Sequence, residues 1–480
     1  MTDAEVKKQF VEDLSDQSDD FSRWYNEVVR KAQLADYSPV RGSMVIRPYG
    51  FAIWEHMQRL LDGRIKATGH QNAYFPLLIP ESLLQKEAEH VQGFAPECAW
   101  VTHGGREELE ERLAVRPTSE AIVCHMYSRW IESYRDLPVL INQWANVMRW
   151  EKVTRLFLRT AEFLWQEGHT AHATHEESLE EVLRMLDVYR DFVETELAIP
   201  VYAGPKSESE KFAGAEMTYA IEALMRDGKA LQAGTSHDLG QHFAKVFDIT
   251  FQDEQGKRQH VWQTSWGLTT RMVGAVVMTH GDDQGLKLPP HVAPHQAVVV
   301  PIWRKEAEKS AVLEFTARVR EALKEKVRLH VDDRDQYSPG WKYNEYELRG
   351  VPVRLEIGPR DVAQSSVMSV RRDTRAKEPI ALDRLAERLP ALLEEIQQAM
   401  FRAAREFRDA NTTGVRTIEE IEAHFAEKRG FVAMPWAGEA ALEARIKERT
   451  GATLRCIPID QSPFAAIAHG ERVALFARAY

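Results

Sequence analysis

Three arginines placed next to apolar or aromatic residues constrain this chain more than any other feature. Arg149 precedes Trp150, Arg159 closes an apolar run, and Arg271 opens another. A buried guanidinium needs an anion, and its planar fork suits phosphate or carboxylate. Neither a GxxxxGK[ST] loop nor a GxGxxG turn after a strand is present, which excludes a P-loop and disfavours a dinucleotide fold. We therefore expect a triphosphate held by arginines on an antiparallel sheet.

Composition bounds the class of protein. The chain has 480 residues, of which 44% are hydrophobic, enough for two or three domains with separate cores. Its net charge of −11 is unlike that of a generic nucleic-acid coat protein, so any RNA contact must come from a local patch. The three cysteines show no CxxC spacing, which argues against a disulfide framework or a cysteine zinc site.

The sequence predicts a cytoplasmic protein with no membrane association. Asp3 and Glu5 lie where a signal peptide would be apolar, and apolar runs such as 297–302 are too short to span a bilayer.

A proline-rich connector at 287–291 divides two patterns. Before it, a mixed helical and strand pattern is expected. Its predicted elements are a helix at 49–66, a short strand at 74–79, paired strands at 139–149 and 157–166, a helix opened by the capping box of Thr174 and Glu177, and a glycine-rich helix at 267–279. After it, strands and helices alternate, which predicts a small α/β domain, and a long charged helix at about 383–410 leads to a last module.

Together the motifs resemble one family, the class II aminoacyl-tRNA synthetases, and specifically prolyl-tRNA synthetases of the archaeal and eukaryotic-like type. The resemblance covers essentially the whole chain. Pro76 in its short strand resembles motif 1, 148–151 with the returning segment 157–169 resembles motif 2, and 267–271 resembles motif 3. Two further segments, 116–120 and 234–237, resemble the elements that bind the amino acid.

The resemblance implies an α+β fold of three parts. These are a class II catalytic domain with an antiparallel β-sheet and helices (1–285), an α/β anticodon-binding domain (290–395), and a small α/β C-terminal domain (396–480). The last resembles a zinc-type module that lacks its cysteines. Only Cys456 is retained there, and one cysteine cannot form a closed tetrahedral site, so we expect no zinc and apolar packing through Phe431, Ile446, Ile457 and Phe476.

The same resemblance assigns site residues. Arg149, Arg159 and Arg271 would be catalytic through the phosphates, with Arg149 on the α-phosphate and Arg271 also stacking on adenine opposite Phe163. The ATP site is expected to comprise Arg149, Glu151, Arg159, Thr160, Phe163, Gln232, Thr235, Thr269 and Arg271. The proline site is expected to comprise Thr118, Glu120, Trp165, His169, Phe212, His237 and Ser265, with Glu120 accepting from the imino group.

Metal ions are expected only with the nucleotide. Magnesium would screen charge on the leaving pyrophosphate, although no acidic cluster marks its ligands. His169, His172 and His175 have a three-residue spacing that invites a metal-site interpretation, but that spacing fits the strand–helix boundary poorly. We therefore assign no metal-ligating residue.

Two further expectations follow from the family pattern. Glu347, Arg354 and Arg360 would lie at the tRNA anticodon, where an arginine can take guanine O6 and N7 together. Only 104 residues separate Glu162 from Gly267, which is too short for the editing domain that common bacterial prolyl enzymes insert there. Selectivity would then depend mostly on the pocket.

The implied activity is ATP-dependent attachment of L-proline to tRNA(Pro), through prolyl-adenylate and with release of diphosphate. Motif 1 implies a homodimer. One alternative is a catalytically silent paralogue that acts as a tRNA-binding or regulatory protein. The retention of all three arginines argues against it, because a silent copy has no need for them. Another is a synthetase for threonine or histidine; Thr118 with Glu120, and the lack of a zinc triad in the catalytic region, disfavour threonine.

Overall fold

The computed structural model describes residues 14–88, 97–468 and 471–480. Its largest element is a seven-stranded sheet with the order β3-β7-β8-β14-β11-β10-β9, antiparallel throughout except for the pair β3 and β7. The strands are β3 (Gln71–Asn72), β7 (Val139–Met148), β8 (Glu162–His172), β9 (Val201–Pro205), β10 (Met217–Leu224), β11 (Ala230–Gly240) and β14 (Trp262–Thr269). The predicted antiparallel sheet is thus confirmed.

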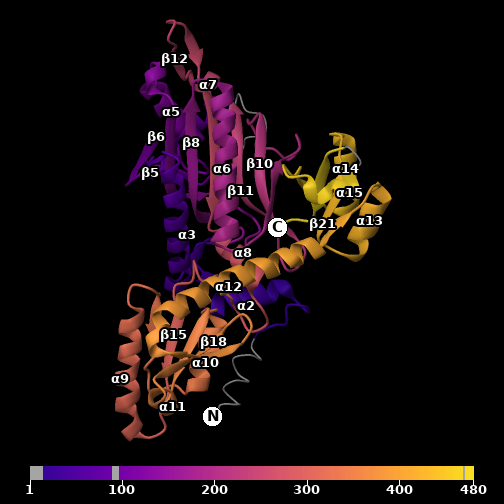
Figure 1. The fold of residues 1–480 in the computed structure, drawn as a ribbon. Coiled ribbons are helices and arrows are strands. Elements are labelled where there is room, and N and C mark those ends of the chain that lie inside the picture. Colours follow the sequence, from indigo (N-terminus) through magenta and orange to yellow (C-terminus); the bar gives the residue numbers. More distant parts are fainter. Residues whose placement is uncertain (1–13, 89–96, 469–470) are drawn as a thin grey trace.

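Helices α3 (Pro48–Ala67), α6 (His175–Thr195) and α8 (Arg271–His280) lie on one face of this sheet, and α2 (Phe21–Lys31) packs against α8 (Figure 1). The predicted capping box opens α6, where the Thr174 side chain accepts from the Glu177 N–H and the Glu177 carboxylate accepts from the Thr174 N–H.

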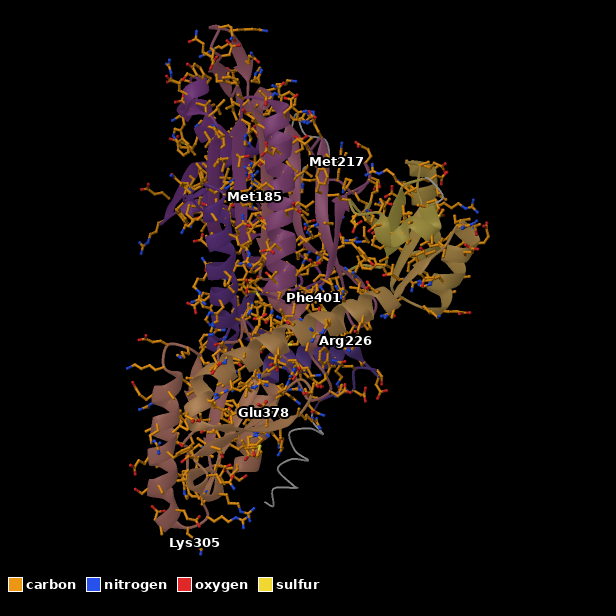
Figure 2. The ribbon with its side chains drawn as sticks, viewed as in Figure 1. Met185, Met217, Arg226, Lys305, Glu378 and Phe401 are labelled. Carbon is orange, nitrogen blue, oxygen red and sulfur yellow. The ribbon has the colours of Figure 1, made fainter. Side chains whose placement is uncertain are left out.

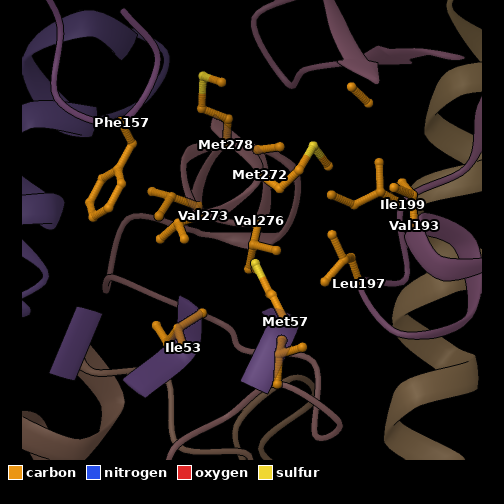
Figure 3. Close-up of a cluster of buried hydrophobic side chains, with 14 of the residues drawn as sticks. Ile53, Met57, Phe157, Val193, Leu197, Ile199, Met272, Val273, Val276 and Met278 are labelled. Carbon is orange, nitrogen blue, oxygen red and sulfur yellow. The ribbon is translucent and has the colours of Figure 1, made fainter. Parts of the chain in front are cut away.

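Helix α8 is the centre of the main core. Every residue from Met272 to His280 is buried, as expected for a helix that is apolar on all sides. Figure 3 shows Met272 and Val276 of α8 among Met57 of α3 and Val193 of α6. This packing fixes the first residue of α8, Arg271, at the end of β14.

Smaller elements flank the large sheet. One of them is a three-stranded sheet of order β4-β6-β5. Residues of this sheet and of the helices Glu81–Ala88, Glu120–Trp130 and His242–Phe247 contribute to the second hydrophobic cluster. The flanking elements are β1 (Ala35–Tyr37), β2 (Met44–Ile46), β4 (Leu78–Pro80), α4 (Glu81–Ala88), β5 (Trp100–Gly104), β6 (Glu107–Val115), α5 (Glu120–Trp130), η1 (Tyr134–Asp136), α7 (His242–Phe247), β12 (Thr250–Gln252) and β13 (Arg258–His260).

The region after the connector forms a mixed five-stranded sheet of order β16-β15-β17-β18-β19, in which β15 is parallel to β16 and β17. It matches the predicted alternation of strands and helices. Its elements are β15 (Ala297–Pro301), α9 (Glu306–Leu323), β16 (Leu329–Val331), α10 (Pro339–Leu348), β17 (Val353–Ile357), α11 (Pro359–Ala363), β18 (Ser366–Arg371) and β19 (Lys377–Ala381).

The long helix α12 (Leu382–Ala410) crosses from this sheet, beneath the large sheet, to the C-terminal module (Figure 1). In the view of Figure 2, Phe401 of α12 lies between Glu378 of the five-stranded sheet and Met217 of the seven-stranded sheet. The Gln397 side chain donates to the carbonyls of Thr195 and Glu196, at 2.8 and 3.1 Å, and so attaches α12 to the end of α6.

The C-terminal module is a four-stranded sheet of order β20-β21-β23-β22. Phe431, Ile446 and Phe476 are buried in it, and Ile457 is partly buried against the cluster that contains Ile446 and Phe476, so the predicted apolar packing is confirmed. Its elements are β20 (Thr412–Gly414), α13 (Ile418–Glu427), β21 (Phe431–Pro435), α14 (Ala440–Thr450), β22 (Thr453–Cys456), η2 (Ser462–Phe464), α15 (Ala465–Ala468) and β23 (Val473–Ala477).

Three predicted elements were wrong in their bounds. Residues 267–269 end strand β14, and the helix begins only at Arg271. The strand that returns from the motif 2 loop begins at Glu162 rather than at 157. The strand predicted at 74–79 is reduced to β4, which begins at Leu78 and belongs to the three-stranded sheet. Within the described ranges, no helix combines the length and the apolar character needed to span a membrane.

Candidate active site

A cavity of about 310 Å³ opens on the face of the large sheet opposite α6 and α8. It is lined from strands β8, β11 and β14, from the loops around them, and from the first residue of α8. All sixteen residues predicted for the catalytic, proline and ATP sites line it: Thr118, Glu120, Arg149, Glu151, Arg159, Thr160, Phe163, Trp165, His169, Phe212, Gln232, Thr235, His237, Ser265, Thr269 and Arg271. The structure thus brings the predicted set together, while the role of each residue stays a prediction.

Arg149 extends from the end of β7 into this cavity. Its Nε donates to the Pro117 carbonyl at 3.0 Å, and its guanidinium lies 5.6 and 5.5 Å from the ring centroids of Phe163 and Trp165. Burial lowers the pKa of Arg149, although the carboxylates of Glu120, Glu167 and Glu151 oppose that shift. The remaining guanidinium donors are therefore available to an anion inside a partly desolvated space.

Arg271, the first residue of α8, lines the same cavity. Its Nε donates to the Leu158 carbonyl at 3.2 Å and its Nη1 to the Gln232 carbonyl at 3.4 Å. Burial and the nearby Arg149 both lower the pKa of Arg271. Two guanidinium groups that repel each other within one cavity create a positive potential that a polyphosphate would neutralise.

Arg159 differs from the sequence expectation, and Arg116 limits the rule that a buried guanidinium needs an anion. Arg159 is not in an apolar setting: its side chain is 61% exposed and its Nε donates to Glu151 Oε2 at 2.8 Å. Arg116 is buried but needs no anion, because it donates to the carbonyls of Phe75 and Asn146, both at 2.7 Å. Backbone carbonyls can satisfy a buried guanidinium, and the sequence does not distinguish them from a ligand.

The deep end of the cavity is anionic and hydrogen-bonded. Thr118 Oγ1 donates to Glu120, and both side chains are buried. Beside them His169 Nε2 lies 3.1 Å from Glu167 Oε2, and Gln143 and Ser119 also donate to Glu167. Burial alone would raise the pKa of Glu167, but these hydrogen bonds and the His169 charge outweigh it and lower that pKa.

His237 lies on β11 at the apolar wall of the same end. Its ring centroid is 4.8 Å from that of Phe212, and Nδ1 is 2.9 Å from Thr218 Oγ1. Burial lowers the pKa of His237 to about 3, with Lys206 adding to the shift. His237 is therefore a neutral, shape-defining side chain at ordinary pH.

Sequence reasoning missed several lining residues, among them Glu167, Lys206, Lys211 and Trp266. Glu167 carries a usable signal, because it lies two residues before His169 on a strand and so faces the same side. Lys206 follows the edge strand β9 without any local motif.

The three histidines considered as metal ligands do not converge. His169 pairs with Glu167, His172 bonds to Thr170, and His175 Nε2 lies 2.7 Å from Asp238 Oδ2. Across the described segments, the one group of potential metal-binding side chains is His175, Glu216 and Asp238, with ligand atoms within 4.8 Å of one another. The absence of a metal-ligating residue stays a prediction.

The residues predicted for the anticodon lie on three consecutive elements of the region after the connector, Glu347 on α10, Arg354 on β17 and Arg360 on α11. Arg354 of β17 donates to Glu347 and Glu356, both at 3.0 Å, and its guanidinium stacks 3.9 Å from the Tyr343 ring centroid. Arg360 is exposed on α11. Arg371, Arg372 and Arg375 line a small groove with Arg354 and Glu347 that sequence reasoning did not identify.

The fold and the cavity define a class II aminoacyl-tRNA synthetase. Residues 100–280 match the family model "tRNA synthetase class II core domain (G, H, P, S and T)", 296–392 match "Anticodon binding domain", and 418–480 match "Prolyl-tRNA synthetase, C-terminal".

Relatives that match almost the full length of the chain narrow the class to one kind of synthetase. The chain is 57% identical to a proline--tRNA ligase of Natranaerobius thermophilus, over 98% of this chain and 99% of the relative. It is 60% identical to one of Rubrobacter xylanophilus, with the same coverage. A crystal structure of prolyl-tRNA synthetase from Cryptosporidium parvum, complexed with halofuginone and AMPPNP, superposes with a TM-score of 0.93 at 41% identity, covering 97% of this chain and 99% of that one. The chain belongs to the proline--tRNA ligase family.

Proposed function

We propose that this chain attaches L-proline to tRNA(Pro) in two steps, in the cytoplasm and as a homodimer. One observation carries the proposal: Arg149 and Arg271 line one cavity together with the buried Glu120 and Glu167. The cavity therefore offers positive potential for a polyphosphate next to carboxylates for a secondary ammonium. Family membership agrees with this pairing.

In the first step, a proline carboxylate oxygen attacks the α-phosphorus of ATP, a bond to that phosphorus forms, and diphosphate leaves with the bonding electrons. Arg149 would stabilise charge on the α-phosphoryl oxygens, because its guanidinium is already oriented by Pro117, Phe163 and Trp165. Arg271, with the more exposed Arg159, would hold the distal phosphates. Arg159 has Glu151 as its partner at 2.8 Å and would exchange it for phosphate.

The remaining members of the predicted set would complete the two subsites. Thr160, Gln232, Thr235 and Thr269 would contact the nucleotide, and Phe163 would stack on adenine. Glu120, held by Thr118, would accept from the proline ammonium, and Trp165, His169, Phe212, His237 and Ser265 would enclose the ring.

Magnesium would enter with ATP and screen charge on the leaving diphosphate. Magnesium sites in such enzymes use one or two carboxylates together with phosphate oxygens. Glu151 and Glu210 line the cavity and are partly buried, each near one cation. The donor set therefore fits an ion carried by the nucleotide. No zinc is proposed: burial raises the pKa of the Cys456 thiol, which disfavours the thiolate a metal needs.

In the second step, a terminal ribose hydroxyl of tRNA attacks the carbonyl carbon of prolyl-adenylate, forms the ester and releases AMP. Glu347, Arg354 and Arg360 would contact the anticodon in the domain at 290–395. The catalytic domain would span 1–285 and the C-terminal domain 396–480. Pro76 would lie near the dimer interface, as motif 1 does in the family that the sequence resembles.

Aminoacylation of tRNA(Pro) with labelled proline tests the proposal. We expect charging that depends on ATP and proline, and amino-acid-dependent ATP–pyrophosphate exchange with proline that exceeds exchange with threonine or histidine. A chain that binds tRNA(Pro) but supports neither reaction would instead be the silent paralogue.

A further inference from the structure

A buried charge network joins the C-terminal module to the wall of the cavity. Arg455 of β22 donates to both oxygens of Glu222 on β10, from Nε and Nη2, each at 3.0 Å. Lys206 Nζ lies 3.5 Å from Glu222 Oε1. The exposed fractions of the side chains are 8% for Arg455, 0% for Glu222 and 4% for Lys206, so this pairing is desolvated.

Two members of this network reach the cavity wall, Lys206 directly and Glu222 through its strand neighbour. Lys206 is a lining residue. Glu222 is the strand partner of Gln232, whose carbonyl accepts from Arg271. The charges of Glu222 and Arg455 both act on Arg271, in opposite directions.

The position of Arg455 is set by backbone pairing between the two units. Strand β9 is the edge of the large sheet, and the segment after β22 pairs with it. Ile457 N–H donates to the Pro205 carbonyl and Ile459 N–H to the Ala203 carbonyl, both at 2.8 Å. A side chain at Gly204 would place its Cβ 2.0 Å from the Ile457 carbonyl oxygen, so only glycine permits this approach. The C-terminal module thereby covers an edge strand and inserts Arg455 behind the cavity.

We propose that Arg455 is a positioning residue for ATP binding, acting from the C-terminal module by neutralising Glu222. Because Arg455 takes both oxygens of Glu222 at 3.0 Å, Lys206 is held more loosely, 3.5 Å from Glu222 and 3.4 Å from the Arg455 carbonyl, and the guanidinium of Arg271 stays available to an anion in the cavity. Without Arg455, the buried carboxylate attracts Lys206 more strongly and competes with phosphate for Arg271. The inference rests on the proposed function, since ATP is the ligand whose binding changes.

The test compares Arg455→Met with Arg449→Met in proline-dependent ATP–pyrophosphate exchange. Arg449 is a matched control, because it pairs with Glu422 at 2.7 Å inside the same module and is 47% exposed. We expect the KM for ATP to rise about tenfold in Arg455→Met with kcat within about threefold, and to stay at the wild-type value in Arg449→Met. An equal KM for ATP in all three proteins would overturn the inference.

A double variant separates charge neutralisation from general damage. Adding Glu222→Gln to Arg455→Met removes the uncompensated charge, and we expect the KM for ATP to return to within about threefold of wild type. A KM that stays high would show that Arg455 acts otherwise. If Arg455→Met does not fold, the polar and uncharged Arg455→Gln takes its place: a KM for ATP above wild type in Arg455→Gln and near wild type in the double variant supports the inference, and any other order contradicts it. Exchange by the wild-type protein tests the proposed function separately, because its absence would refute that function whatever the variants show.

Discussion

Nε2 of His169 lies 3.1 Å from Oε2 of Glu167, and both side chains are buried in the wall of the cavity. The pairing raises the pKa of His169, although burial alone would lower it. The protonated form is thus favoured below this raised pKa and is lost as pH rises through it.

ATP binding should therefore weaken as pH rises through the raised pKa of His169. Deprotonation of His169 makes the cavity one unit more negative and leaves the charge of Glu167 without this cationic partner, so Glu167 attracts Arg149 more strongly and we expect the KM for ATP to increase with pH. His169→Gln should remove that part of the pH dependence, whereas His237→Gln should keep it, because His237, with a pKa of about 3, is neutral throughout. Steady-state exchange kinetics from about pH 6 to 9 would measure this. Identical pH profiles for His169→Gln and wild type would contradict the assignment.

Adenylate formation should require the planar guanidinium of Arg149, which lysine cannot replace. Arg149→Lys keeps the charge but loses the planar guanidinium that contacts the Phe163 and Trp165 rings, so we expect kcat for ATP–pyrophosphate exchange to fall about 10²- to 10³-fold. Arg112→Lys is the matched control, because Arg112 pairs with Glu81 outside the cavity and is 52% exposed. A loss of similar size in the control, or none in Arg149→Lys, would refute the role.

Replacing Arg354 should weaken the charging of tRNA(Pro) and leave adenylate formation unchanged. Removing a bidentate contact to a guanine weakens recognition by about 1–3 kcal/mol, so Arg354→Ala should lower kcat/KM for tRNA(Pro) about 5- to 150-fold. Pyrophosphate exchange should be unchanged. Arg388→Ala, which breaks a more exposed pairing with Glu378 near the same sheet, should leave both reactions intact. Parallel losses in charging and exchange would argue for general disruption.

The cavity should activate smaller amino acids to a measurable extent. The segment 162–267 is occupied by strands of the core sheet, helices α6 and α7, and the short hairpin of β12 and β13, so no editing domain is inserted there. Each missing methylene is worth about 1–3 kcal/mol of discrimination. We expect exchange with alanine and with cysteine above background and below proline. Exchange indistinguishable from background for both would show that the pocket alone is more selective than this.

Local signals predicted the elements whose structure depends on nearby residues. The capping box of Thr174 and Glu177 predicted where α6 begins, and the apolar spacing of 49–66 predicted α3. Both depend on contacts within one or two turns. By contrast, 267–269 were predicted as helix because the run continues into α8, whereas pairing with β8 and β11 keeps them in a strand.

The site residues, too, could be predicted only where a local motif marks them. The motif arginines could be found because the family pattern places them, but the pattern could not show that Arg159 is mostly exposed or that Arg116 is satisfied by carbonyls. The pair of Glu222 and Arg455 joins residues 233 apart and leaves no local signal. Such contacts depend on tertiary pairing and cannot be read from spacing.

A structure of this protein with proline and a non-hydrolysable ATP analogue would test the central claim most directly. We predict the triphosphate between Arg149 and Arg271, with their guanidinium nitrogens within hydrogen-bonding distance of phosphate oxygens, and the proline ammonium at Glu120. Nucleotide bound elsewhere, with both guanidinium groups still bonded only to protein carbonyls, would contradict the account.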